Sequence, residues 1–199
     1  MSYSTPIEST VSLKDLDLKM QGYSAEIKSK LSWLTYAFGL SERIVEMRDE
    51  KEYVYPAIYQ DTNKQEMLSL MPSDLYKAFC FWVRNAELSF VEDDWSRIKT
   101  GVSLIFFMDL RAIAPTENWQ LTKTKIQADI FEALRQTHYA GLGVLMPVAA
   151  LDEDITKIYE GFSVDQLDNK YKTYPKYAIR IDFDYGFLRE CNSGFNAYS

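Results

Sequence analysis

The stretch GVSLIFFMDLRAIAP at residues 101–115 is the feature that most constrains the fold of this chain. Its apolar run covers only residues 102–108 before Asp109 interrupts it. A helix that crosses a bilayer needs roughly 20 apolar residues, so this run excludes a membrane span. A strand that is apolar at consecutive positions has to be covered on both faces. The stretch therefore predicts an inner strand of a sheet over residues 100–113, ended by Pro115.

Two other segments have the spacing of amphipathic helices. In residues 16–38 apolar residues recur every three or four positions, and Gly39 follows as a residue suited to a helix end. Gly22 interrupts this run, so its firm part is expected to start near Ser24. Residues 120–136 repeat the helical period and end before two glycines. The first stripe consists of Leu16, Met20, Tyr23, Ile27, Leu31, Leu34 and Phe38.

The remaining ordered segments are predicted to be strands and connections. The residues around Ile44 alternate in polarity, and together with the next two segments they favour a β-meander. Pro56 predicts that the second strand of this meander lies at a sheet edge or carries a bulge, because proline cannot donate to a ladder. The clearest alternation covers residues 178–185. The predicted strands are 42–48, 53–59, 67–71, 78–84, 100–113, 144–151 and 178–185, with an exposed connection at 85–98 and a Tyr-rich arm at 159–177.

This order of elements predicts an α+β fold. We expect a single antiparallel or mixed β-sheet with two helices packed on one face, in one domain that covers residues 1–199. Residues 1–10 and 192–199 are expected to form a loose arm and tail. The second face of the inner strand then has to meet the arm at 159–177 or a neighbouring copy of the chain.

Composition narrows the classes of function. The net charge of −7 argues against sequence-specific or wrapping contacts with nucleic acid, whose binding depends on neutralised phosphates. The start MSYSTPIEST has neither the basic residues nor the apolar run of a signal peptide, so we expect a cytoplasmic protein without membrane contacts.

No motif for catalysis, a cofactor or a metal stands out. His138 is the only histidine, so neither a zinc site nor a Ser/His/Asp triad is favoured. Glycine-rich phosphate-binding motifs are absent from the sequence. The acidic runs at 92–94 and 152–154 lack the ligand spacing of an EF-hand and are interpreted as solvated loops.

Carboxylates on one predicted strand leave an enzyme as the least favoured alternative. Asp182 and Asp184 share one strand face with Arg180, and two nearby carboxylates are one arrangement for general acid/base chemistry. The interpretation we favour is a polar sheet face on which Asp109 and Arg111 pair across the sheet with Arg180 and Asp182.

Seven segments, in order along almost the whole chain, carry a family resemblance. The chain resembles small phage or prophage virion proteins from Bacteroidetes-type hosts, and its α+β order is similar to that of tail-terminator and tail-completion proteins. The segments are LSWLTYAFG (31–39), YVYPAIY (53–59), LSLMPSD (68–74), FCFWV (79–83), SLIFFMDLRAI (103–113), IYEGFSVDQLDNKY (158–171) and PKYAIRIDF (175–183).

The resemblance implies a non-enzymatic structural protein, a tail-terminator or head–tail connector ring subunit. Its partners would be other copies of itself and neighbouring virion proteins, in the host cytoplasm during assembly and then in the virion. It implies no cofactor and no catalytic residue. The alternative is a monomeric or dimeric interaction module of a prophage or host. The predicted interface residues are Phe106, Tyr159, Phe162, Tyr171 and Tyr174.

Overall fold

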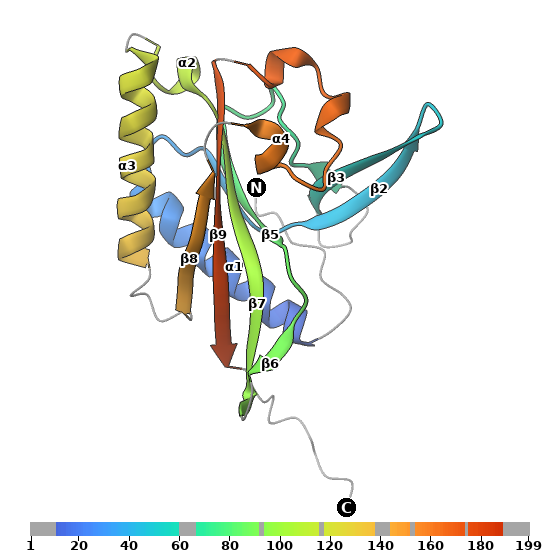
Figure 1. Ribbon diagram of the computed structural model, residues 1–199. Helices are drawn as coiled ribbons and strands as arrows, with labels where there is room; N and C mark the ends of the chain where they lie inside the picture. Colours follow the sequence, from blue (N-terminus) through green and yellow to red (C-terminus); the bar gives the residue numbers. More distant parts are fainter. Residues whose placement is uncertain are drawn as a thin grey trace, which may run out of the picture.

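The computed structural model describes residues 11–59, 67–91, 94–115, 118–137, 144–151, 154–173 and 175–188. The predicted arm at 1–10 and tail at 192–199 lie outside these ranges. Two long helices and several short ones accompany the strands (Figure 1). The helices are α1 (Val11–Lys30), α2 (Leu110–Ile113), α3 (Trp119–Thr137) and α4 (Ile155–Ile158), with short 3-10 turns η1 (Val164–Gln166) and η2 (Asn169–Tyr171).

The strands form two sheets. The larger one is mixed, with the order β1-β5-β7-β9-β8 and β6 paired to β7; β1 runs parallel to β5 and the other pairs are antiparallel. The smaller sheet has the order β2-β3-β4. The strands are β1 (Tyr36–Leu40), β2 (Glu42–Arg48), β3 (Lys51–Tyr59), β4 (Met67–Ser69), β5 (Ala78–Arg84), β6 (Ser89–Val91), β7 (Asp94–Asp109), β8 (Val144–Leu151) and β9 (Lys176–Leu188).

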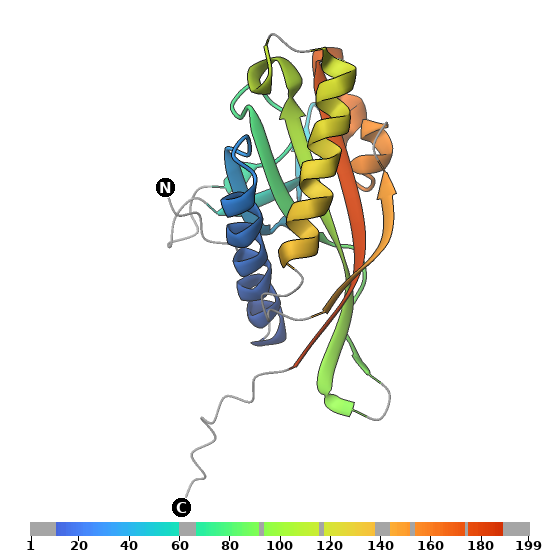
Figure 2. The ribbon, with the colours of Figure 1, turned by 90° about the vertical axis from the view of Figure 1, so that its left-hand side faces the viewer.

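The inner strand predicted from residues 101–115 is β7, and it is covered on both faces. Phe106 points into a core formed with α1 and α3, which lie on the same side of the large sheet (Figure 2). Ile105 and Phe107 point into a second core against the small sheet, α4 and η1. The α+β character is therefore as predicted, but the single sheet is wrong. The meander packs its own apolar side across the large sheet, so it forms a separate layer.

The first helix ends earlier than its apolar spacing predicts. It stops at Lys30, and residues 36–40 form β1 beside β5. Leu31, Leu34 and Phe38 are nonetheless buried, so the spacing identified core residues without identifying their backbone. Aromatic residues such as Tyr36 and Phe38 favour strands, and here the ladder to β5 overrides the local helical pattern.

Side chains of α1 close the outer edge of β1. The Ser24 hydroxyl donates to the Phe38 carbonyl at 2.5 Å, and the Trp82 indole N–H donates to Ser24 at 3.0 Å. The Leu40 N–H donates to the Asp17 carboxylate at 3.1 Å. An edge whose backbone groups already have partners offers little to a further strand. This end of the large sheet is therefore sealed within the chain.

Two other boundaries and the position of Pro56 differ from the sequence prediction. The connection expected at 85–98 contains β6 and the start of β7. The strand expected up to residue 113 ends at Asp109, because its carboxylate accepts from the Arg111 N–H at 3.0 Å and caps α2. Pro56 lies in the middle strand of the small sheet. The prediction of an edge strand or a bulge at Pro56 is therefore wrong. Pro56 has no N–H to donate, but its carbonyl accepts from the N–H of Leu70, one residue past the end of β4, at 2.8 Å.

Candidate functional site

The structure places two of the five predicted interface residues in the interior. Phe106 and Tyr159 are both 0 % exposed, so each contacts this chain's own core, which corrects their assignment to a surface. Phe162 and Tyr171 are partly buried, and the Tyr171 hydroxyl donates to the Asp74 carboxylate at 3.0 Å. Tyr174 lies outside the described residues. The arm at 159–177 covers the second face of the large sheet. This is one of the two alternatives predicted from the sequence, the other being a neighbouring copy.

The charged residues on β9 have partners within the sheet, but not the predicted ones. The pairing register puts Lys176 opposite Asp109, and their side chains form an ion pair at 2.7 Å. Arg180 donates to Asp182 on its own strand at 2.7 Å, and Ser103 donates to the same carboxylate at 2.6 Å. The predicted cross-sheet pairing of Asp109 and Arg111 with Arg180 and Asp182 is therefore wrong.

The remaining candidate groups yield no site among the described residues. Asp184 is exposed on β9, and Asp154 caps α4 by accepting from the Thr156 N–H at 2.9 Å. Within the described ranges no group of three or more His, Cys, Asp or Glu side chains could hold a metal ion. His138, 92–93 and 152–153 lie outside those ranges. None of the described helices has the length and apolar character that a membrane crossing requires.

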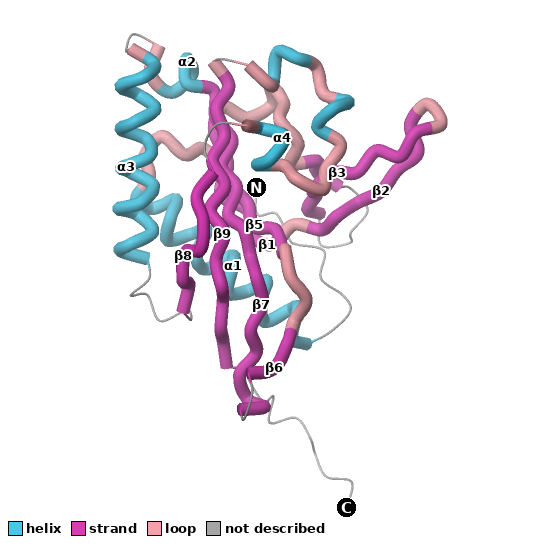
Figure 3. Tube along the Cα trace, in the orientation of Figure 1, coloured by secondary structure: helices cyan, strands magenta, loops and turns pink. Residues whose placement is uncertain are grey.

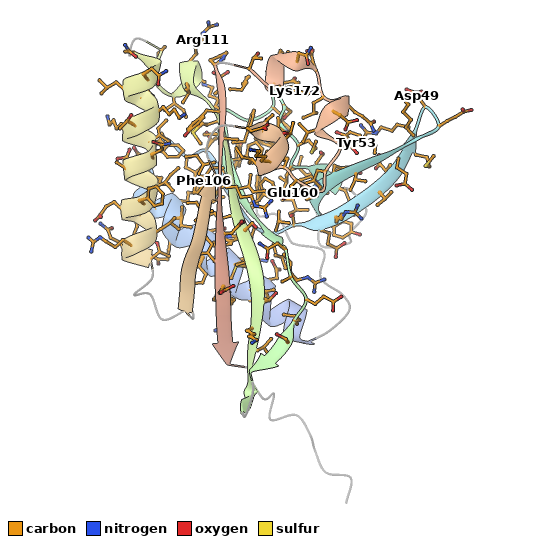
Figure 4. All side chains as sticks on the ribbon, in the orientation of Figure 1. Asp49, Tyr53, Phe106, Arg111, Glu160 and Lys172 are labelled. Carbon is orange, nitrogen blue, oxygen red and sulfur yellow. The ribbon has the colours of Figure 1, made fainter. Side chains whose placement is uncertain are left out.

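The most distinctive surface is the hairpin formed by β2 and β3. It projects away from the two packed layers, and Asp49 marks its far end (Figures 1 and 4). One face is stiffened by contacts between polar and aromatic side chains. Arg48 lies over the Tyr53 ring at 3.7 Å from the ring centroid and pairs with Glu46 at 3.1 Å. The Tyr55 hydroxyl also donates to Glu46, and this hydrogen bond is the largest influence that lowers the pKa of the Glu46 carboxyl.

The opposite face of the hairpin carries exposed apolar side chains. Val45 is 48 % exposed and Met47 is 67 % exposed, although both lie on a regular strand. Single exposed apolar residues are common, but neighbouring ones on a projecting element often mark a contact surface. The sequence showed the alternation of Val45 and Met47 with Glu46. The structure adds that the face with Ile44 and Glu46 is partly buried, whereas the face with Val45 and Met47 is exposed.

The outer edge of β2 is open. The order β2-β3-β4 leaves β2 without a strand neighbour on that side among the described residues (Figure 3). The partners of Val54 fix the direction of the backbone groups: its N–H and carbonyl both bond to Ser163, at 2.9 and 2.8 Å, on the side away from β2. Val45 is opposite Val54, so its own N–H and carbonyl point outward, away from β3.

A recess lies at the base of this hairpin. It has a volume of about 590 Å³ and lies between the start of β2, the end of β5 and the turn at Glu160–Phe162. Arg180 also lines it, and its Nε donates to Asp182. The chemistry of this lining suits the binding of a polar or acidic group from a partner. The lining residues that bear charge are Glu42, Arg43, Arg84, Glu160 and Arg180.

The hairpin turn has an unfavourable backbone conformation. Asp49 and Glu50 have φ angles of 46° and 63°, and they form a two-residue loop between the paired residues Arg48 and Lys51. Such loops favour Asn-Gly, since both positions are left-handed. A glutamate there is strained, and strain that persists in a structure is a reason to look for a function.

Glycine at the second loop position is expected to stabilise the protein. The substitution Glu50→Gly should raise the free energy of unfolding by about 0.5–1 kcal/mol, because glycine adopts positive φ without a steric cost. Urea denaturation measures this change. The matched control Glu52→Gly, two residues further along in β3, should lower the free energy of unfolding by about the same amount. Equal losses in both variants would contradict the left-handed turn.

No family model and no curated protein matches this chain. The case for a function therefore depends on the geometry of the hairpin, together with the resemblance described above.

Proposed function

We propose that this chain is a non-enzymatic structural protein that works by binding other protein subunits, as a phage tail-terminator or head–tail connector ring subunit. The observation that carries the proposal is the projecting β2–β3 hairpin, with its open edge and exposed Val45 and Met47. A hairpin of this kind exposes backbone donors and acceptors that another chain can satisfy. The resemblance to virion proteins supports the choice of a ring subunit among the possible assemblies.

The polar chemistry of the described residues fits this proposal. The carboxylates that offered an enzymatic alternative are engaged in structural contacts, as for Asp182 with Arg180, or stand exposed, as for Asp184. The buried Cys80 has the raised pKa of a thiol held in an apolar environment, which does not favour a reactive thiolate. The geometry thus favours recognition over bond-making chemistry.

A second candidate is a monomeric or dimeric interaction module. It is favoured by the closure of the body, because the consecutive apolar residues of β7 have both faces covered within one chain. The argument that an uncovered face of β7 requires a ring neighbour therefore no longer applies. What remains for a partner is the hairpin and the recess at its base.

Negative-stain electron microscopy of the purified full-length chain at high concentration separates the two candidates. A ring subunit is expected to give annular particles of uniform diameter, and light scattering is expected to give a fixed multiple of the chain mass. The variant carrying Val45→Lys and Met47→Lys should lose the particles while it keeps its fold by circular dichroism. Discrete monomers or dimers without rings would contradict the ring role and support the interaction module.

A further inference from the structure

We infer that β2 pairs with β2 of a second copy, antiparallel and about a twofold axis at Val45. The inference rests on the proposed role in protein–protein contacts, and it names the first contact and its register. The pairing would join two three-stranded sheets into one continuous six-stranded sheet across the two copies. A twofold contact is complete with two copies, so a ring would need an additional head-to-tail surface.

The backbone of β2 is suited to this pairing. Every second residue of β2 turns its N–H and carbonyl groups outward, away from β3. These residues are Arg43, Val45 and Met47, which lie opposite Pro56, Val54 and Glu52 of β3. The strand runs from Glu42 to Arg48 without a glycine, proline or recorded bulge. The far part of the hairpin projects from the body (Figure 3), while its start at Glu42 adjoins the recess lined by the end of β5.

The other strand edges of the described chain are less suited to accept a partner. Side chains of Asp17 and Ser24 occupy the edge of β1. The edge strand β8 contains Pro147, with a register shift between Pro147 and Ala149. Proline and bulges are features that blunt strand edges against further pairing. The edge strands β4 and β6 are only three residues long, and short edge strands also resist further pairing. The seven-residue strand β2 has no proline and no bulge, so it is the most suitable edge among the described residues.

The charges of β2 select one register. Antiparallel pairing centred on Val45 places Glu42 opposite Arg48 of the second copy, and the symmetry repeats this opposite-charge pair. Moving the register by one step in either direction puts Glu42 opposite Glu46, or Glu46 opposite its own symmetry mate. Centring the pair on Arg43 places two arginines together. The Val45 register is thus the one that aligns the whole strand without opposing like charges.

The exposed apolar residues agree with the same register. On the face that carries Val45 and Met47, the two Val45 side chains meet at the axis. Each Met47 then lies opposite the Arg43 of the second copy, whose aliphatic stem can cover it. Val45 and Met47, at 48 % and 67 % exposed in the single chain, would each bury part of this surface against the second copy. The pairing therefore accounts for the exposure and the charge pattern together.

Two charge-reversed variants test the register directly. Glu42→Arg and Arg48→Glu each place like charges opposite one another in both symmetry-related pairs, so each alone should dimerise about tenfold or more weakly. Mixed together, they restore opposite charges in both pairs of the heterodimer. Sedimentation velocity of the full-length proteins, from about 1 µM to about 1 mM, measures each association and that of the equimolar mixture.

Matched controls separate the contact from folding. Glu52→Arg makes the same charge change on β3, outside the predicted contact, and should leave dimerisation within about twofold of wild type. Val45→Pro removes an outward-pointing N–H that β3 does not use, so the dimer should be lost while the fold remains. Circular dichroism and thermal unfolding of every variant confirm that the monomer is intact.

The result expected is a salt-sensitive wild-type dimer, weakened in each single variant and recovered in their mixture. A wild type that stays monomeric at about 1 mM overturns the inference, as does a dimer that neither charge reversal affects. The same experiments test the ring proposal independently of the β2 contact. Rings that form despite both reversals would overturn this contact alone, while register-dependent dimers that never give rings would overturn the ring role alone.

Discussion

Replacing Phe106 with alanine is expected to lower the free energy of unfolding by about 3–5 kcal/mol. The side chain is 0 % exposed and lies in the core between the large sheet and the two long helices, with the Trp33 ring centroid 6.4 Å from its own. Removing the ring leaves a cavity that close-packed neighbours fill only in part. A domain of this size is typically stable by only about 5–15 kcal/mol, so urea denaturation should show a large shift in midpoint.

The exposed Val45 provides the matched control. Val45→Ala should change the free energy of unfolding by no more than about 0.5 kcal/mol, because the side chain has little to lose in the single chain. Phe106→Leu should recover part of the stability that alanine loses, since it refills much of the volume. A Phe106→Ala protein that unfolds like wild type but fails to assemble would restore this residue to the interface predicted from the sequence.

The inner position of β7 was predictable because it depends on a run of consecutive apolar residues. Ile105, Phe106 and Phe107 can be buried together only in a strand with a layer on each side, and that is how they lie. What covers the second face was not predictable. The sequence left open an arm or a neighbouring copy, and the structure supplies the arm and the small sheet. Their approach is a long-range property that local spacing does not encode.

The end of α1 shows where periodicity misleads. Leu31 and Leu34 continue the helical spacing and are buried, but they lie in a turn beyond the helix. Burial is common to both conformations, so the spacing of apolar residues identified the core without fixing its backbone. The choice between helix and strand for Phe38 was made by the ladder to β5, which lies some forty residues along the chain.

The candidate contact surface was predictable only in part. The alternation through Val45 and Met47 identified a strand. That the outer edge of this strand is open follows from the strand order of the small sheet, which the local sequence does not encode. The aromatic residues chosen from sequence instead, such as Tyr159, are apolar enough to be drawn into the core. Apolar character alone therefore does not separate a core residue from a contact residue.

Asp17 gives the second large effect, because it is an acid held in the interior. Its side chain faces the edge of β1 and the residue is 6 % exposed. Burial raises its pKa to about 6 from an ordinary value of 3.8, against the opposing hydrogen bonds from the Leu40 N–H and the Gln21 amide. Between pH about 4 and pH about 6 the unfolded chain therefore releases a proton that the folded chain keeps. The contribution of Asp17 to the free energy of unfolding is therefore largest below pH about 4, and it decreases as the pH rises from about 4 to about 6.

The substitution Asp17→Asn is expected to remove this pH dependence and to raise the free energy of unfolding at pH 8 by up to about 3 kcal/mol relative to wild type. The asparagine carbonyl still accepts from the Leu40 N–H, so the edge of β1 stays closed without a buried charge. Glu26→Gln, an exposed acid on the same helix, should change the free energy of unfolding by no more than about 0.5 kcal/mol at either pH. Urea denaturation at pH 4 and pH 8 measures the difference between the proteins. If Asp17→Asn is less stable than wild type at pH 8 by the same amount as at pH 4, the carboxylate is a net stabilising partner of β1, and its burial carries no electrostatic penalty.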